Sequence, residues 1–195
     1  MNAIKLREMP LSKGCHKSPQ EGVCVMEVVS YVAGERFSDH PLCACRVMGE
    51  FLRSWNDALD DESRQMLKQF VPMLVNSASS PIVEQKRRNM IKEWYYRVYA
   101  PAFLDLAGFT EFAENGRKEG ENADWEAARA AARAVAGAAA WAAAREAARA
   151  VAGAAAWAAA GAAAGAAAGE ALEPTVVQLQ NSALQLVRDC LAIRE

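Results

Sequence analysis

An alanine-rich tract near the C-terminus constrains this chain more than any other feature. Residues 126–172 contain 30 alanines in 47 positions. Alanine has the highest helix propensity of all residues, but it buries little apolar surface. We therefore predict that the tract is helical and that the hydrophobic core comes from the other residues, whose composition is that of an ordinary globular domain.

The tract repeats every 16 residues, as Trp125, Trp141 and Trp157 show. A four-residue step advances about 40° around an α-helix, so the repeated positions wind around the axis and no single partner surface can cover all three tryptophans. Glycines spaced by four over 161–169 would let another helix pack closely. We favour the simpler interpretation, a helical spacer that grew by duplication.

A single straight helix over 125–172 would be about 70 Å long at 1.5 Å per residue. A break between Gly153 and Gly169 would instead fold the tract into a hairpin, because interior glycines weaken a helix. No alternating strand pattern is present. The predicted fold is all-α, a single compact helical domain of five or six helices with a long Ala-rich helix or helical hairpin.

Composition divides the chain into five segments. Residues 1–17 are expected to be irregular, 18–109 to form a helical core domain, and 110–124 to form a polar linker. Residues 125–172 are the repetitive helical arm. A C-terminal helix over 174–195 is expected to pack on the core.

Capping residues indicate where the helices begin and end. Gly34 and Gly108 are expected to end helices, and Pro101 is expected to bend the helix in which it lies. The expected helix starts are Ser18 (with Glu21 completing a capping box), Ser38, Asp60, Ser80 and Pro174.

The N-terminus lacks the apolar run of a secretory signal, and the five cysteines are an odd number. We therefore expect reduced thiols and a cytoplasmic protein. The uncharged stretch 150–169 is long enough to cross a bilayer, but it consists almost wholly of alanine and glycine. Because these residues gain little from lipid, we predict no membrane span.

Lys and Arg total 22 and Asp and Glu 24, which gives a net charge of −2. Such a balance argues against a protein dedicated to binding a nucleic-acid backbone. The segment 86–99 is a local exception, because basic and aromatic residues interleave there as in sites for single-stranded nucleic acid. The nucleic-acid candidates are Lys86, Arg87, Arg88, Lys92 and Tyr96. We favour the alternative, a helix with a buried aromatic face and a solvated basic face.

Residues 15–45 contain both histidines and four of the five cysteines. Zinc prefers thiolate and imidazole ligands, so this region could in principle supply a metal site. The metal candidates are Cys15, His16, Cys24, His40 and Cys43. Their spacing lacks a Cys-x2-Cys pair, so no cofactor is expected, and zinc is the alternative.

A second hypothesis for the same region is a cysteine nucleophile. Cys24 would attack, His40 would act as its base, and Asp39 or Glu27 would orient the base. Against this hypothesis, Cys24 is expected well inside a helix, away from the N-terminus where a thiolate is stabilised.

We favour a structural interpretation of these residues. Glu27 falls on a mostly apolar helix, and a buried carboxylate needs hydrogen-bond partners. We expect Tyr31, His40 or an arginine to provide them. His40 is expected to cap the second helix, and Cys24 and Cys45 are expected to be small core residues.

Several motifs resemble those of a group of bacterial and bacteriophage helical proteins that has no assigned function. The motifs are EGVCVME at 21–27, YVAG at 31–34, SDHP at 38–41, WND at 55–57, RVYAP at 97–101 and LDLAG at 104–108, followed by the alanine- and tryptophan-rich tract. The resemblance covers most of the chain. It implies a bacterial or phage-infected intracellular setting, and it implies no reaction and no catalytic residues.

These features predict a non-enzymatic helical interaction or scaffold protein, whose partner is another protein or a second copy bound through the arm. The alternative is an accessory protein with a metal- or thiol-dependent site near Cys24 and His40. A third hypothesis is nucleic-acid binding through the helix 86–99.

Overall fold

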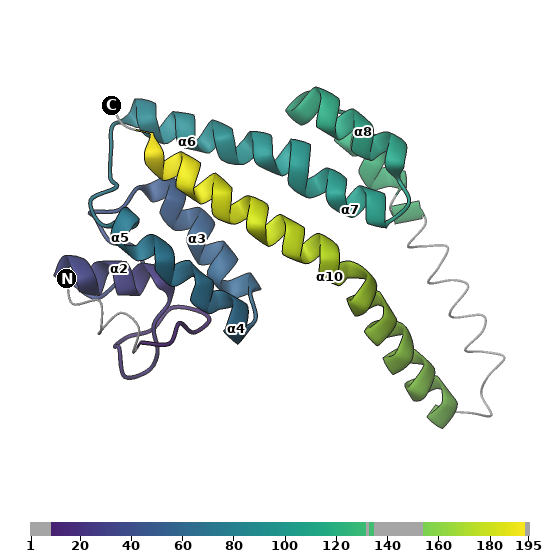
Figure 1. Ribbon diagram of the computed structural model, residues 1–195, viewed down its shortest axis with the longest axis horizontal. Coiled ribbons are helices and arrows are strands. Elements are labelled where there is room, and N and C mark those ends of the chain that lie inside the picture. The colour runs from purple at the N-terminus through teal and green to yellow at the C-terminus, as the bar shows by residue number, and fades with distance from the viewer. Residues whose placement is uncertain (1–8, 132, 135–153, 194–195) are drawn as a thin grey trace. The chain divides into compact units, whose positions relative to one another are not determined.

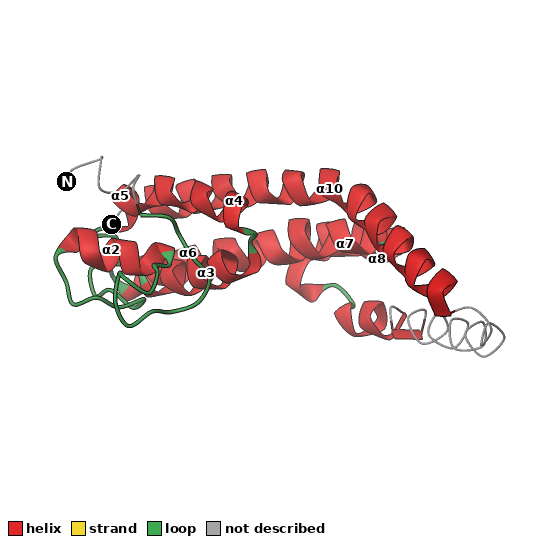
Figure 2. Ribbon diagram, turned by 90° about the horizontal axis from the view of Figure 1, so that it is seen from below, coloured by secondary structure: helices red, strands yellow, loops and turns green. Residues whose placement is uncertain are grey.

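A computed structural model describes residues 9–131, 133–134 and 154–193 of the chain. Within these residues every regular element is a helix, and Figure 2 shows helices joined by loops. This confirms the predicted all-α fold. The chain forms two compact units: unit 1 comprises Met1–Ile91 and Leu184–Glu195, and unit 2 comprises Lys92–Ala183. Each unit is described below by itself.

Unit 1 is built around α2, which packs against both α3 and α5 (Figure 1). The last part of α10 lies beside the first part of α6 and completes this unit. The elements are α2 (Val25–Ala33), α3 (Arg46–Ala58), α4 (Asp61–Arg64), η1 (Gln65–Phe70), α5 (Val71–Leu74), α6 (Pro81–Trp94) and α10 (Ala154–Ala192), the last two shared with unit 2. The core is mostly aliphatic and includes Val25, Val29, Leu52 and Val187 together with the aromatic Phe70, all fully buried.

The first helix begins later than the sequence predicts. A capping box was expected at Ser18, but the capping box that forms joins Cys24 to Glu27, and α2 starts at Val25. The reason is a contact with a distant residue: the backbone N–H of Ser12 donates to the carbonyl of Val23 at 2.7 Å, which keeps Val23 extended. Gly34 ends α2 with φ 73°, as expected for a left-handed C-cap.

The second helix also begins later, at Arg46 rather than near Ser38. The intervening chain is a loop that Glu35 holds, because its carboxylate accepts the N–H groups of Leu42 at 2.7 Å and Cys43 at 2.8 Å. These bonds lower the pKa of Glu35, the bond from Leu42 contributing most. His40 therefore does not cap the second helix.

Asp60 begins the third helical segment as predicted. Its carboxylate accepts the N–H groups of Glu62 at 3.0 Å and Ser63 at 2.8 Å, which satisfies two free donors of the first turn. The segment then changes to a 3-10 turn over Gln65–Phe70 before the short helix that contains Pro72. A proline cannot donate a backbone hydrogen bond, so the division of this segment follows from its sequence.

Unit 2 contains the end of α6, η2 (Tyr95–Tyr99), α7 (Ala100–Leu106), α8 (Thr110–Glu119) and η3 (Gly120–Asn122). It also contains helical residues 125–131 and the part of α10 that precedes Leu184. The π-helical turn η2 directly precedes Pro101. Pro101 has no N–H to donate, and the π-helical turn before it is wider than an α-helical turn.

The segment 110–124, expected to be a polar linker, contains the helix α8. Its polar composition obscured the helix because the buried positions, Ala113 and Gly116, are small. A Cβ added to Gly116 would lie 2.6 Å from the ring of Trp125 and 3.1 Å from Pro101. The missing side chain therefore lets α8 approach both residues closely.

Pro174 lies inside α10 and does not begin a helix as predicted. The helix already runs from Ala154, so the glycines at 161, 165 and 169 do not break it. The other residues at which the tract was expected to turn back as a hairpin, 135–153, lie outside the described residues. None of the helices in the described ranges has the combined length and hydropathy of a membrane span.

Candidate functional site

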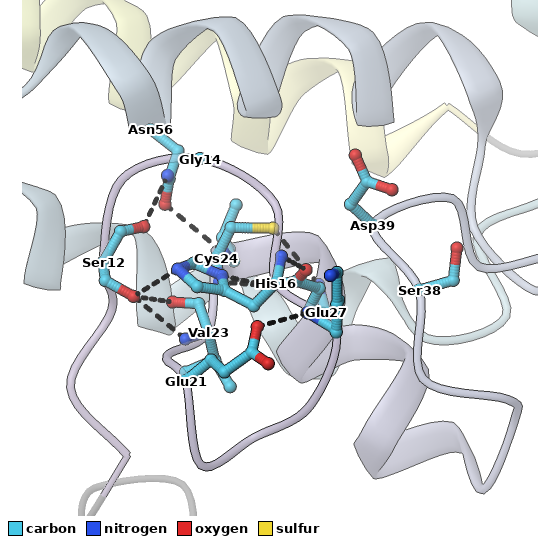
Figure 3. A network of polar contacts seen from close by, with 12 residues as sticks. Ser12, Gly14, His16, Glu21, Val23, Cys24, Glu27, Ser38, Asp39 and Asn56 are labelled. Carbon is cyan, nitrogen blue, oxygen red and sulfur yellow. Dashed lines mark hydrogen bonds and ion pairs between the residues drawn. The ribbon is translucent and has the colours of Figure 1, made fainter.

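The carboxylate of Glu27 is the centre of a buried polar cluster in unit 1 (Figure 3). Glu27 is 1% exposed and accepts three hydrogen bonds. The backbone N–H of His16 donates to Oε1 at 2.6 Å, and Oε2 binds the His16 ring Nδ1 at 2.8 Å and the N–H of Cys24 at 2.7 Å. The partner of Glu27 is therefore His16, not His40 or Tyr31 as expected.

Ser12 extends this cluster on the other side of the imidazole. Its hydroxyl Oγ lies 3.2 Å from Nε2 of His16, so Ser12, His16 and Glu27 are connected in the order of a hydrolytic triad. The same Oγ accepts the N–H of Val23 at 2.9 Å and contacts its carbonyl at 3.3 Å. The Ser12 hydroxyl is thus engaged in holding the backbone of the loop.

Gly22 covers the Ser12–His16 pair. A Cβ at this position would lie 2.5 Å from Ser12 Oγ and 2.7 Å from His16 Nε2, and its φ of 140° also favours glycine. A side chain at position 22 would therefore collide with both residues, and the close approach of the loop to Ser12 and His16 requires glycine. We conclude that this arrangement holds the segment 9–24 against α2.

Two side chains of α3 hold the same segment from a second direction. Asn56 is buried, donates to the carbonyl of Ser12 at 3.0 Å and accepts the N–H of Val25 at 3.3 Å. The neighbouring Asp57 accepts the N–H of Gly14 at 2.8 Å. The loop is therefore bonded to both α2 and α3 through side chains, which explains how an irregular segment is held in one conformation.

Cys24 is the N-cap of α2, not an interior helix residue as predicted. Its Sγ accepts the N–H of Glu27 at 3.5 Å. A helix N-terminus ordinarily lowers the pKa of a thiol. Here burial, together with the charge of the Glu27 carboxylate, raises the pKa of Cys24 to about 12. Cys24 is consequently a protonated thiol at neutral pH and lacks the activation that a nucleophile requires.

Thiol labelling at pH 7.5 checks this assignment. Cys15 is exposed and Cys24 is buried, so we expect Cys24 in the native protein to react about 1,000-fold more slowly than Cys15. Cys190, whose pKa burial raises to about 11, should also be slow. The control is Cys15→Ser, which should abolish the fast phase; equal labelling rates for Cys15 and Cys24 would contradict the assignment.

The five zinc candidates do not converge. His16 binds Ser12 and Glu27, Cys24 caps α2, and Cys15 is exposed. His40 instead pairs with the adjacent Asp39, with Nδ1 and Oδ1 2.7 Å apart. Across the described ranges, no group of three or more His, Cys, Asp or Glu side chains has an arrangement that could hold a metal ion.

The basic candidates of unit 1 differ in their roles. Arg87 is 2% exposed and donates to three backbone carbonyls: Ser77 at 2.8 Å, Cys190 at 2.9 Å and Ile193 at 3.2 Å. Its neighbour Arg88 is exposed and binds the side chain of Gln85 at 2.7 Å. Arg87 therefore joins α6 to the end of α10 and is not a surface cation; Lys86 is exposed.

The candidates of unit 2 also contact protein groups. Lys92 forms an ion pair with Glu121 at 2.7 Å, which raises the pKa of Lys92. The ring of Tyr96 packs against Trp125 with centroids 5.4 Å apart. Arg97 binds Glu93 and donates to the carbonyls at the end of α8.

A feature that the sequence did not predict is an exposed aromatic stripe in unit 2, formed by Tyr95, Tyr99 and Phe103. The rings of Tyr95 and Tyr99 stack with centroids 5.6 Å apart, and Phe103 follows Tyr99 at 5.0 Å. The three residues are 47%, 37% and 38% exposed. The four-residue spacing of these aromatic residues in the sequence places them on one face of a helix. The sequence analysis predicts that the aromatic face is buried, whereas these three rings are exposed.

No family model matches the chain, and no curated protein and no solved structure matches it. The function is therefore inferred from the contacts themselves. In unit 1 the polar groups bind one another, and within the described residues no buried side-chain N or O atom lacks a partner. In unit 2 an apolar surface is exposed.

Proposed function

We propose that this chain is a non-enzymatic helical interaction protein that associates with a second copy of itself through the aromatic stripe of unit 2. The observation that carries the proposal is the continuous contact of Tyr95, Tyr99 and Phe103 at the surface. Apolar neighbours enlarge this surface, since Val98 is 39% and Leu106 41% exposed. Continuous apolar patches on a soluble domain are typical of interaction sites.

The side chains of the stripe suit a protein contact. Tyrosine contributes a large, rigid area with few rotatable bonds and is enriched among the residues that dominate interface energies. In a two-fold symmetric dimer each stripe residue occurs twice, so three rings supply six. The stripe also lies on consecutive helical elements, η2 and α7, which hold its rings in place.

The charges around the stripe favour a second copy over a nucleic acid. Lys92 pairs with Glu121, Arg97 with Glu93, and Arg117 with Asp105. Binding to a phosphate backbone depends on cations that are free to replace counterions, and these cations already have carboxylate partners. A surface of paired charges does not repel its own copy.

The polar cluster of unit 1 supports the non-enzymatic part of the proposal. Cys24 is a buried, protonated thiol, and Ser12 is engaged by the backbone of Val23 beneath Gly22. These groups hold a loop, and nothing in their geometry leaves a nucleophile facing a substrate. We propose a bacterial or phage-infected cell as the setting, on the resemblance of the motifs.

Sedimentation of the full chain over a range of concentrations tests the proposal. We expect the wild-type mass to rise from monomer to dimer, and the double variant Tyr99→Ser, Phe103→Ser to weaken association by about tenfold or more. The matched control is Tyr31→Ser in unit 1, where Tyr31 is 42% exposed but outside the stripe. It should associate as the wild type does.

Two outcomes would contradict the proposal. One is a wild-type mass that stays monomeric at about 100 μM, a concentration that detects weak dimers. The other is a dimer that the stripe variant leaves unchanged. Circular dichroism of each variant keeps loss of association separate from loss of folding.

A further inference from the structure

A cavity of about 360 Å³ in unit 1 is lined by residues that belong neither to the Glu27 cluster nor to the aromatic stripe. Residues of α2, of the loop before α3 and of α3 itself line it. Its apolar lining includes Met26, Ala44 and Cys45, all of which are buried. Its polar lining comes from the charged side chains of α3 and from His40. The volume falls in the range of small-ligand sites, which combine an apolar wall with a few polar groups.

Gly49 lies in the wall of this cavity. It lies within α3, where glycine costs up to about 1 kcal/mol relative to alanine. A Cβ there would lie 3.3 Å from Nη1 of Arg53 and 3.4 Å from Cε of Met26. A side chain at this position would therefore press on both Arg53 and Met26, which belong to the charged and the apolar parts of the lining.

The charged lining is arranged along one face of α3. Arg46, Glu50 and Arg53 follow one another at helical spacings of four and three. Asp39 orients two of the polar groups: its carbonyl accepts Nη1 of Arg53 at 2.9 Å, and its carboxylate binds Nδ1 of His40 at 2.7 Å. The Nε2 atom of His40 is consequently directed away from Asp39.

Arg46 and Glu50 have no side-chain ion pair or hydrogen bond with any residue in the described ranges. Arg46 can therefore donate to a ligand, and guanidinium groups bind carboxylates in a bidentate geometry. The first turn of α3 also borders the cavity, and its first N–H, that of Arg46, donates to the carboxylate of Glu84 at 3.3 Å. Arg53 and His40, which Asp39 already orients, lose little entropy when a ligand binds.

From this cavity we infer a binding site for a small organic carboxylate with an apolar body. The carboxylate contacts Arg46 and Arg53, and the apolar body lies against Met26 and Cys45. An α-amino acid with an aliphatic side chain has the same chemistry plus an ammonium, for which Glu50 is the acceptor.

The methyl resonance of Met26 reports directly on this site. The full chain, labelled with 13C at its methionine methyl groups, is titrated with hexanoate, with norleucine and, as an uncharged control, with hexanamide. We expect a saturable shift with hexanoate or norleucine, and binding of hexanamide weaker by about tenfold. No saturation with either carboxylate, or equal binding of hexanamide, would overturn the assignment.

Two variants separate this site from general effects on folding. Gly49→Ala adds a methyl group that presses on Arg53 and Met26 in the cavity wall and, because alanine favours a helix, is expected to keep or raise stability while weakening binding by about fivefold or more. Arg46→Gln should weaken carboxylate binding by a similar factor. The matched control, Arg88→Gln, changes an exposed arginine outside the cavity and should bind normally. Unchanged binding by Gly49→Ala would also overturn the assignment.

Discussion

Glu27→Ala should lower the free energy of unfolding by about 3–5 kcal/mol, because it removes a buried charged acceptor and leaves its donors without partners. The N–H of Cys24 and both donors of His16 lose their bonds at once (Figure 3). The capping box of α2 disappears with the same change. Urea denaturation followed by circular dichroism measures the loss.

Glu21→Ala is the matched control for this variant. Glu21 is an exposed carboxylate six residues earlier, and its bond is to the N–H of Lys17 at 3.1 Å. We expect its effect to stay within about 0.5 kcal/mol, as is usual at the surface. If Glu27→Ala changed the unfolding free energy as little as Glu21→Ala does, the cluster would not hold the loop as described.

Local signals were sufficient to predict those features that depend on a few adjacent residues. Asp60 caps its helix because its carboxylate reaches N–H groups two and three residues ahead. Gly34 and Gly108 adopt positive φ of 73° and 80° at helix ends, which side chains disfavour. Pro101 perturbs its helix because proline has no backbone N–H to donate, whatever residues surround it.

Contacts with distant residues decided the features that the sequence did not predict. Both Ser18 and Cys24 precede a glutamate by three residues, so each pair could form a capping box. The capping box forms at Cys24 because the side chains of Ser12 and Asn56 accept the backbone N–H groups of Val23 and Val25. The helical periodicity of the sequence cannot reveal these two hydrogen bonds, because the bonded residues lie 11 and 31 positions apart in the chain.

The same reason limited the prediction of the polar cluster. Burial of Glu27 implied that it needs partners, and the structure supplies them. The identity of the partner depends on the path of the loop, which brings His16 over the start of α2. The basic composition of the segment 86–99 also indicated that Arg87 is a surface cation. Arg87 is buried instead, because its guanidinium binds carbonyls that lie more than 100 residues away in the sequence.

Arg87→Met should lower the free energy of unfolding by at least about 4.5 kcal/mol, because hydrogen bonds to a charged donor contribute about 1.5–3 kcal/mol each and three are lost. Two of them bind the carbonyls of Cys190 and Ile193 at the end of α10, and the Cys190 carbonyl also accepts the N–H of Ile193 at 3.4 Å. Arg87→Lys should recover only part of the loss, since an ammonium lacks the planar fork of a guanidinium.

Arg88→Met provides the comparison, because it changes the adjacent, exposed arginine, and we expect a change within about 0.5 kcal/mol. Hydrogen exchange locates the effect: in Arg87→Met the amides of the last turns of α10 should exchange faster, because the end of the helix is no longer joined to α6. Equal stability of the two variants would show that the carbonyls are satisfied without Arg87. A difference as large as expected would show that one buried cation joins two segments far apart in sequence.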